Sequence, residues 1–445
     1  MKLRPSQSQA AKVIAQGSVL LLADVGSGKT ATVLTAIRRK RLMEPKRTLV
    51  LGTNRICNMV WPVEATQWAP ELRVESVAGK VAHKRKAMME DPGADVVCLN
   101  FANVAWAIKE YDSKLPEMFP WLVIDESSKM ENPISKSCQA LYKVLKDFEW
   151  RIPMTGTPRA NYLHDIWGSA YLADLGNALG KSKEAFFQNW FYTKRTTFGC
   201  EWVPKALAEQ SIYQELRASC YRMAFDGEKP QVQEINIMLP LHVTVDEWQR
   251  YTSARLKAGD KTVTIHGGDI TIAREGNRVA MKYIQMASGL IYTDEGETIQ
   301  IHTEKLDALQ EIIDEAKGEP AMVVVNYTHE RDALLQRFPV ARVLDKSPET
   351  LSDWNAGKIP MLLVHPASCG HGLNAQFGGA LQVWFSPPLD AEFYVQTIGR
   401  LARPGQKSPL VRVLRLIMNG TEDMRHYNTV CARAIGDKQS LAMLG

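Results

Sequence analysis

The chain has 445 residues, 45% of them hydrophobic and 23% charged, which is the composition of an ordinary soluble globular protein with two or three domains. No run approaches the roughly 18 apolar residues of a membrane-spanning helix, and the start MKLRPSQSQAAK has no apolar signal core. We therefore expect no membrane partner. The formal net charge of +5 is compatible with a polyanionic partner.

The cysteines show no pattern of a metal site or of a disulfide framework. They form no C-x-x-C pair, and no histidine stands at zinc-binding spacing. We expect all seven to be small buried hydrophobic residues in a reducing interior. They occupy positions 57, 98, 138, 200, 220, 369 and 431.

Two series of short apolar runs alternate with helical stretches, which predicts an α/β fold with two parallel sheets covered by helices on both faces. The first series is Val19–Leu22, Thr48–Leu51, Val96–Leu99, Leu122–Ile124 and Ile152–Thr155. The second series is Ala321–Val325, Ala341–Leu344, Met361–Val364, Gln382–Phe385 and Val411–Ile417.

The stretch between the two series breaks the strand pattern. Aromatic and charged residues at helical spacing in KEAFFQNWFY and ALAEQSIYQELRASCYRM predict a helical insertion at about 160–228. The segment EKPQVQEINIMLPLHV that follows is predicted to be an extended crossing. We expect one domain over residues 1–235, including the insertion, and a second over 236–445.

The first apolar run leads into LLADVGSGKT, a glycine loop before a predicted helix, which indicates a phosphate-binding loop. Lys29 would neutralise the β- and γ-phosphates, and the Thr30 hydroxyl would bind Mg²⁺. Gly28 fits the pattern, but Ala23 stands at the first glycine position. This alanine costs little if its backbone does not need a positive φ. The alternative is a structural glycine turn.

Asp125 and Glu126 directly follow the apolar run Leu122–Ile124. Beside a phosphate loop, Asp125 would hold Mg²⁺ through water, and Glu126 would orient and deprotonate the attacking water. The alternative is a pair of solvated acids that cap a helix N-terminus.

With these pieces in place, the chain resembles superfamily 2 helicases and translocases, and more narrowly their Swi/Snf-type branch, in which Ala is common at position 23. The segment LRPSQSQ is the first part of the resemblance, and seven further motifs follow it in order. They are ADVGSGKT, NRICNMVWPVEATQW, IDESSKMEN, MTGTP, VVVNY, HPASCGHGLN and QTIGRLARPGQ. The spellings DESSK and HPASCGHGLN are similar to those of compact bacteriophage and prophage members.

The resemblance implies two RecA-like domains that face a nucleotide cleft, with ATP and Mg²⁺ as cofactors. It implies that Gln7 reads the adenine, and that Gly26, Gly28, Lys29, Thr30 and Gln396 also bind the nucleotide. Arg400 and Arg403, three residues apart on a predicted helix, would be arginine fingers to the γ-phosphate. The alternative for GRLARPGQ is a basic surface turn.

The resemblance also implies a groove for a nucleic-acid backbone. Its candidate contacts are Thr53, Asn54, Arg55, Ser368, Gly370, His371 and Gly372. The motif MTGTP, which corresponds to motif III of this superfamily, would couple ATP hydrolysis to nucleic-acid binding through Thr155, Gly156 and Thr157, with ordinary strand-to-turn chemistry as the alternative.

Further nucleic-acid contacts are open at the sequence level. The basic stretches HKRKAMM (83–89) and TKRTTFG (193–199) are either DNA contacts or solvated faces. Trp61, Trp68, Trp106 and Trp121 favour core positions over base stacking.

Three functions follow from this interpretation. The first is a DNA-stimulated ATPase that translocates on double-stranded DNA through its phosphate backbone, in the cytoplasm of a bacterium or of a phage-infected host. The second is a helicase that separates strands of DNA or RNA. The third is an ATP-gated adaptor that recruits a nuclease or replication protein, since the sequence shows no nuclease metal cluster.

Overall fold

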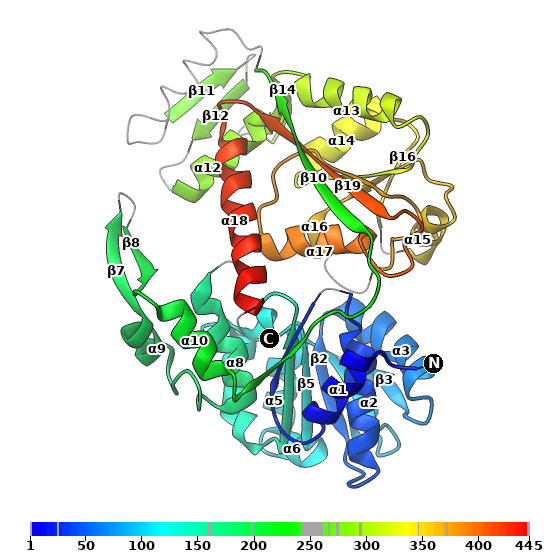
Figure 1. Cartoon of the computed structure of the whole chain (residues 1–445), viewed down its shortest axis with the longest axis vertical. Helices are drawn as coiled ribbons and strands as arrows, with labels where there is room; N and C mark the ends of the chain where they lie inside the picture. The colour runs from blue at the N-terminus through cyan, green and yellow to red at the C-terminus, as the bar shows by residue number, and fades with distance from the viewer. Residues whose placement is uncertain are drawn as a thin grey trace. The chain divides into compact units, whose positions relative to one another are not determined.

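The computed structural model of the chain describes residues 2–24, 26–158, 162–196, 199–241, 261–265, 268–272, 276–292, 296–345, 347–369 and 373–442. The chain divides into two compact units (Figure 1). The first comprises Met1–Gly227 with Ile435–Gly445, and the second comprises Glu228–Ala434. Each unit contains its own parallel sheet.

Over the described residues, the sheet of the first unit has seven parallel strands in the order β3-β4-β2-β5-β6-β1-β9. Its central strands are the apolar runs of the first predicted series, because strands buried on both faces read as continuous hydrophobic segments. The strands are β1 Leu20–Ala23, β2 Thr48–Gly52, β3 Val74–Ser76, β4 Val96–Asn100, β5 Trp121–Asp125, β6 Trp150–Thr155 and β9 Cys220–Met223.

Helices cover both faces of this sheet, as predicted. Helices α1, α2 and α3 pack on the face that presents Leu21, Val50 and Val123. Helices α4 to α7 pack on the face that presents Leu49 and Leu122. Their bounds are α1 Pro5–Ile14, α2 Lys29–Arg41, η1 Ile56–Val60, α3 Trp61–Trp68, α4 Ala82–Glu90, η2 Phe101–Asn103, α5 Val104–Tyr111, α6 Lys114–Met118, η3 Ser127–Met130, α7 Lys136–Val144 and η4 Leu145–Asp147.

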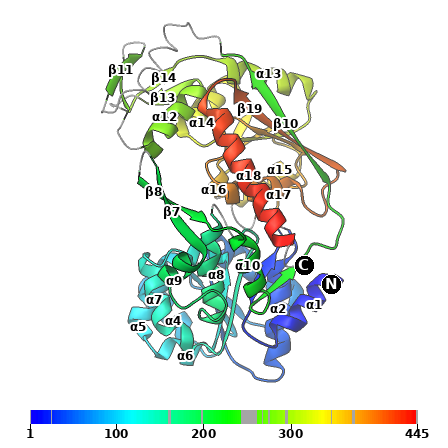
Figure 2. The same cartoon turned by 60° about the vertical axis from the view of Figure 1, so that its left-hand side comes forward.

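The insertion contains helices and also a hairpin that the sequence did not predict. Helix α9 ends where the aromatic stretch continues into β7, and β7 pairs antiparallel with β8 (Figure 2). The predicted helix through ALAEQSIYQELRASCYRM is wrong at its end, because CYRM forms β9 beside β1. The elements are η5 Leu163–Asp165, α8 Ile166–Asp174, α9 Lys183–Trp190, β7 Phe191–Thr196, β8 Gly199–Pro204 and α10 Ala208–Leu216.

The sheet of the second unit has six parallel strands in the order β10-β19-β18-β15-β17-β16 over the described residues. The predicted extended crossing is β10, which pairs with β19 along its whole length. The strands are β10 Gln231–Leu239, β15 Ala321–Val324, β16 Ala341–Val343, β17 Met361–Val364, β18 Leu381–Trp384 and β19 Leu410–Met418. Separate two-stranded pairs are β11 Lys261–Ile265 with β12 Gly268–Ile272, and β13 Leu290–Tyr292 with β14 Thr298–Gln300.

Helices cover both faces of the second sheet as well. Helices α15, α17 and α18 pack on the face of Met322 and Leu362. Helices α12 to α14 pack on the face of Val323 and Leu363. The bounds are α12 Gly276–Ala287, α13 Glu304–Glu315, α14 Thr328–Arg337, α15 Pro348–Asn355, α16 Pro366–Cys369, α17 Ala391–Leu401 and α18 Glu422–Ala442.

Among the helices that the structure describes, none combines the length and the apolar character that a membrane crossing requires. All seven cysteines are free, and Cys57, Cys98, Cys138 and Cys369 are buried as predicted. Cys220 and Cys431 are only half-buried, and the prediction is wrong for Cys200, which is exposed on β8. It is exposed because it lies on a two-stranded hairpin, whereas Cys98 lies in a strand that helices cover on both faces.

Candidate functional site

The glycine loop lies between β1 and α2, at the carboxyl end of a central strand, where parallel sheets bind ligands. Ala23 is the last residue of β1 and has no positive φ, so the strand needs no glycine there. Gly26 and Gly28 do have positive φ values, of 79° and 80°. Both need glycine because a side chain is disfavoured in this conformation. Lys29 and Thr30 then open α2, whose N-terminal N–H groups can bind phosphate.

Gln7 on α1 lies directly over this loop. Its Nε2 donates to the Ser27 carbonyl at 3.1 Å, and its Oε1 accepts from the Arg4 N–H at 2.9 Å. A Cβ at Gly28 would lie 2.2 Å from this Nε2, so the contact itself requires glycine. The structure therefore places Gln7 beside the glycines with which it is predicted to bind the nucleotide.

Lys29 and Glu126 bring the phosphate loop and the acidic pair together. The Lys29 Nζ lies 3.1 Å from Glu126 Oε1, and both side chains are largely buried. Glu126 has a φ of 67°, in the left-handed region that non-glycine residues seldom adopt and that is commonest at functional sites. This turn after β5 places the Glu126 side chain next to Lys29.

Asp125 is the last residue of β5 and is buried. The indole Nε1–H of Trp61 donates to its Oδ2 at 2.9 Å. Burial, together with the adjacent Glu126 carboxylate, raises the pKa of Asp125 to about 7, against the opposing effects of Lys29 and Trp61. A buried acid with a neighbouring cation and a raised pKa is typical of a functional site.

The Asp125 carboxylate and the Thr30 hydroxyl supply the hard oxygen ligands that Mg²⁺ prefers. The contact between Lys29 and Glu126 places the segments of these two ligands next to each other. These residues therefore fit a magnesium ion that binds together with nucleotide phosphates. No group of three or more His, Cys, Asp or Glu side chains suited to a metal is found in the described part of the chain.

Motif III lies next to the acidic pair. The Glu126 N–H donates to the Met154 carbonyl at 3.0 Å, and Thr155 ends the adjacent strand β6. Thr155 and Thr157 are buried, and the Thr157 N–H donates to Thr155 Oγ1 at 3.1 Å. Gly156 lies between them. Motif III therefore contacts the Asp125-Glu126 pair through the backbone of Met154.

The second unit holds the predicted arginine fingers. Arg400 lies in α17, whereas Arg403 lies beyond the end of this helix at Leu401, so the expectation that one helix carries both is wrong. Both guanidinium groups nevertheless donate to the Leu373 carbonyl, and Arg403 also donates to Asn374 Oδ1 at 2.6 Å. Gln396 is buried in α17, where its Nε2 donates to Glu392 at 2.8 Å.

The candidate DNA contacts of the first unit follow β2. Asn54 is exposed, whereas Thr53 and Arg55 are half-buried. The Thr53 Oγ1 accepts from the Ile56 N–H at 3.4 Å. In the second unit Ser368 is exposed on α16. The other three predicted contacts, Gly370, His371 and Gly372, lie outside the described residues.

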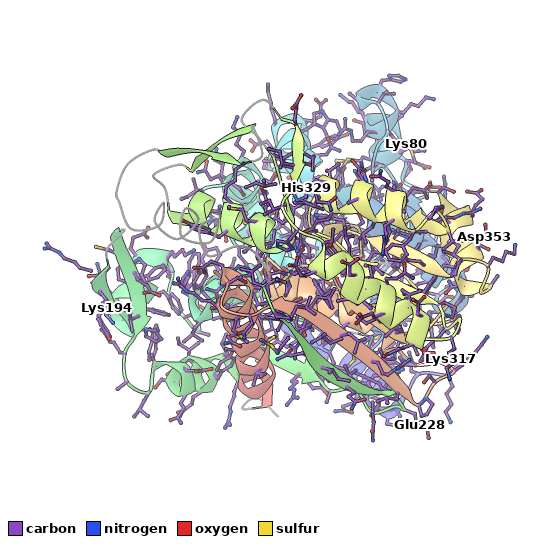
Figure 3. All side chains as sticks on the ribbon, turned by 90° about the horizontal axis from the view of Figure 1, so that it is seen from above. Lys80, Lys194, Glu228, Lys317, His329 and Asp353 are labelled. Atoms are coloured by element: carbon purple, nitrogen blue, oxygen red, sulfur yellow. The ribbon has the colours of Figure 1, made fainter. Side chains whose placement is uncertain are left out.

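The stretch 83–89 lies within α4, and its cations Arg85 and Lys86 contact this protein. Arg85 is buried with its guanidinium 4.1 Å from the Trp106 ring centroid, and Lys86 Nζ lies 2.5 Å from Glu110. The stretch 193–199 forms part of the β7–β8 hairpin, on which Figure 3 marks Lys194. Trp61 and Trp121 are fully buried, as their interpretation as core residues predicted.

The sequence analysis did not predict the contacts that Trp61 and Asp226 make at the site. Trp61 was expected to pack in the core, yet its indole also holds Asp125. Asp226 accepts from the Ser6 N–H at 2.7 Å and lies 3.1 Å from Arg4, which contacts Ser27. These partners are far apart in sequence, so no local spacing could have revealed them.

A glycine loop, its lysine and a strand-terminal Asp-Glu pair define a P-loop ATP hydrolase. The SNF2-related domain matches residues 11–305, and the chain belongs to the SNF2-related family. The Swi/Snf resemblance is thereby confirmed, and the chain is an ATP hydrolase and an ATP-dependent motor of this family.

Several relatives are similar to this chain. Protein p41 of Acyrthosiphon pisum secondary endosymbiont phage 1 is 34% identical over 87% of this chain and 86% of its own length. The SWI/SNF-related matrix-associated actin-dependent regulator of chromatin subfamily A member 1 of Mus musculus is 26% identical over 91% of this chain, which spans 40% of that protein. The Sulfolobus solfataricus SWI2/SNF2 ATPase core in complex with dsDNA matches 100% of this chain and 97% of that chain, with 17% identity and a TM-score of 0.44.

Proposed function

We propose that the chain is a DNA-stimulated ATPase that translocates along double-stranded DNA. The observation that supports the proposal is the 3.1 Å contact between Lys29 and Glu126, two residues that would act in hydrolysis, within a chain of the SNF2-related family. The net charge of +5 suits a polyanionic track. Contacts to a phosphate backbone position a protein without reading sequence, so we expect little base specificity.

Hydrolysis would begin from the ion pair of Lys29 with Glu126. Lys29 would turn from Glu126 towards the β- and γ-phosphates, which frees the carboxylate to orient and deprotonate a water molecule. Thr30 and Asp125 would hold Mg²⁺, which supplies a positive charge to the phosphates when bound. Gln7, Gly26 and Gly28 would bind the nucleotide beside them.

The second unit would complete the reaction. Arg400 and Arg403 would neutralise charge that develops on the γ-phosphate, and Gln396 would bind the nucleotide. Thr155, Gly156 and Thr157 would report the phosphate state to the DNA contacts. Because the residues come from two domains, hydrolysis would be coupled to a change between them.

The DNA track would contact both domains. Thr53, Asn54 and Arg55 would bind one stretch of backbone, and Ser368, Gly370, His371 and Gly372 another. The chain would act in the cytoplasm of a bacterium or of a phage-infected host. A nuclease or replication protein would be its partner where DNA must be cut or copied.

The β7–β8 hairpin favours strand separation as a second candidate function. Tyr192 and Trp202 are 49% and 42% exposed on this hairpin, beside the cations Lys194 and Arg195. Exposed aromatic rings next to cations can stack on unpaired bases.

ATP hydrolysis measured with no nucleic acid, single-stranded DNA, blunt duplex, forked DNA and RNA tests these proposals, with Glu126→Gln as the blank. Strong stimulation by blunt duplex supports the translocase, and displacement of a triplex strand would then show movement. Stimulation by forks or single strands alone, together with strand displacement, would favour the helicase. Equal rates across the whole panel would contradict both and point to an adaptor.

A further inference from the structure

Trp61 makes the only side-chain hydrogen bond that the described residues give to Asp125. Its ring is fully buried among apolar residues on the α1, α2 and α3 side of the sheet. An apolar ring would fill this space without bringing a polar group with it. A buried indole N–H costs free energy unless it has a hydrogen-bond partner. The hydrogen bond of 2.9 Å to Asp125 Oδ2 therefore fixes both the indole ring and the carboxylate.

The same indole belongs to the segment that carries the predicted DNA contacts. Strand β2 ends at Gly52, residues 53–55 follow, and the π-helix η1 leads directly into Trp61 at the start of α3. The backbone N–H of Trp61 donates to the Ile56 carbonyl, which closes a π-type turn. Such turns are rare and occur frequently at functional sites.

This segment packs tightly from its first residue to its last. A Cβ at Gly52 would meet Ile56 Cγ2 at 3.0 Å and Cys57 Sγ at 3.5 Å, so the strand end and the π-turn touch. Cys57 is buried beside the acidic site, where burial and then the Asp125 charge raise the pKa of its thiol to about 12. A displacement of residues 53–55 would therefore reach the Trp61 indole through packed atoms.

We propose that Trp61 is a positioning residue that fixes the Asp125 carboxylate for Mg²⁺ and couples it to the backbone contacts of residues 53–55. The coupling rests on the proposed function, because it requires DNA at residues 53–55. The positioning of Asp125 does not depend on DNA. By reciprocity, Mg²⁺ and nucleotide at the site then act back on the π-turn.

Trp61→Phe tests the proposal, because it removes the N–H and keeps an aromatic ring. Trp150→Phe is the matched control. Trp150 is buried in the same apolar cluster, but its indole donates to the carbonyls of Ile14 at 2.7 Å and Gly17 at 3.2 Å. Both variants should lose similar thermal stability, since each loses one buried indole N–H donor and keeps an aromatic ring.

The first readout is binding of a fluorescent ATP analogue as Mg²⁺ is titrated, without DNA. We expect Trp61→Phe to need about tenfold more Mg²⁺ for half-maximal binding, because groups that orient a metal ligand commonly change metal affinity by this factor. Trp150→Phe should match the unaltered protein. If nucleotide binding depends on Mg²⁺ equally in the two variants, Trp61 contributes only packing and the proposal is overturned.

The second readout is the ratio of duplex-stimulated to basal ATP hydrolysis, measured with saturating Mg²⁺. We expect this ratio to fall severalfold in Trp61→Phe while duplex affinity stays unchanged, because the DNA contacts remain. An unchanged ratio would overturn the coupling. If the unaltered protein shows no stimulation, the proposed function fails instead, and the Mg²⁺ titration still decides whether Trp61 positions Asp125.

A third readout uses the unaltered protein, so it does not depend on whether a variant folds. Backbone hydrogen exchange of residues 53–61 is followed with and without Mg²⁺ and a non-hydrolysable ATP analogue, in the absence of DNA. We expect slower exchange in the π-turn when the site is filled. Exchange that does not change there, while the phosphate loop becomes protected, would contradict coupling through Trp61.

Discussion

Glu126 combines an unusual backbone conformation with a carboxylate that contacts Lys29. Its φ of 67° costs about 1–2 kcal/mol for a residue with a Cβ. The turn brings its carboxylate within 3.1 Å of Lys29 Nζ. Each of these buried charges therefore has an opposite charge beside it, which lowers the cost of burying both.

Glu126→Gln should retain ATP binding and lose hydrolysis. The amide keeps the size of the side chain and leaves Lys29 without a carboxylate to exchange for phosphate, so ATP affinity should stay equal or rise. Loss of a general base should lower kcat by about a hundredfold to ten-thousandfold. Equilibrium binding and steady-state hydrolysis measure the two effects. A kcat within threefold of the unaltered value would remove Glu126 from the mechanism.

At the scale of elements, the first turn of helix α14 contains the buried carboxylate of Glu330. Glu330 Oε2 accepts from the N–H groups of Asn326 at 3.0 Å and Tyr327 at 3.3 Å, and from Ser386 Oγ at 3.1 Å. Figure 3 marks His329, the preceding residue of this helix. Burial raises the pKa of Glu330 from 4.5 to about 7, against the opposing effects of these hydrogen bonds and of Lys305.

Glu330→Gln should change how the stability of the second unit depends on pH. A carboxyl group whose pKa is raised by folding stabilises the fold while protonated. This contribution is complete below its ordinary pKa of 4.5 and is lost as pH rises through about 7. We expect the thermal unfolding midpoint of the unaltered protein to decrease as the pH is raised from 5 to 8. The decrease should be smaller in Glu330→Gln. Glu311→Gln, on the exposed side of α13, should behave like the unaltered protein.

The β7–β8 hairpin offers a second test at this scale. If Lys194 and Arg195 each contact a phosphate, replacing both with Ala should reduce the salt dependence of DNA binding by about two units of slope. ATP hydrolysis without DNA should not change. Lys109 and Lys114, exposed on α5 and α6, supply the control pair of alanine substitutions. Equal salt slopes for the two double variants would identify the hairpin cations as a solvated face.

At the scale of the whole molecule, the residues that we propose for ATP hydrolysis are divided between the two units. Lys29, Asp125 and Glu126 belong to the first unit, and Arg400 and Arg403 to the second. Whether these residues act together within one chain is tested by the following variants.

Arg403→Ala should spare ATP binding and lower kcat by about 10³- to 10⁵-fold, the usual effect of an arginine finger. Mixing Arg403→Ala with Glu126→Gln should restore no activity, because each chain then lacks one essential group. Recovery in the mixture, measured by ATP hydrolysis over a range of ratios, would show that the arginine acts between chains. Normal turnover of Arg403→Ala alone would contradict the finger assignment.

The amino-acid sequence by itself determined the central strands and the order of the motifs. Strands such as β2, β5 and β17 are continuous apolar runs, because both of their faces are buried. The phosphate loop and the Asp125-Glu126 pair were also predictable, because each lies within a few residues of such a strand end. These features depend on interactions between neighbours in the chain.

Tertiary structure alone decided the edge strand β9, the β7–β8 hairpin and the contacts around the acidic pair. The segment CYRM reads as the end of a helix, and only pairing with β1 makes it a strand. Trp61 and Asp125 are 64 residues apart, and Asp226 is 220 residues from Ser6. Local periodicity reports which face of an element is buried, but which buried groups meet depends on how sheets and helices pack, and that is decided by the free energy of the whole unit.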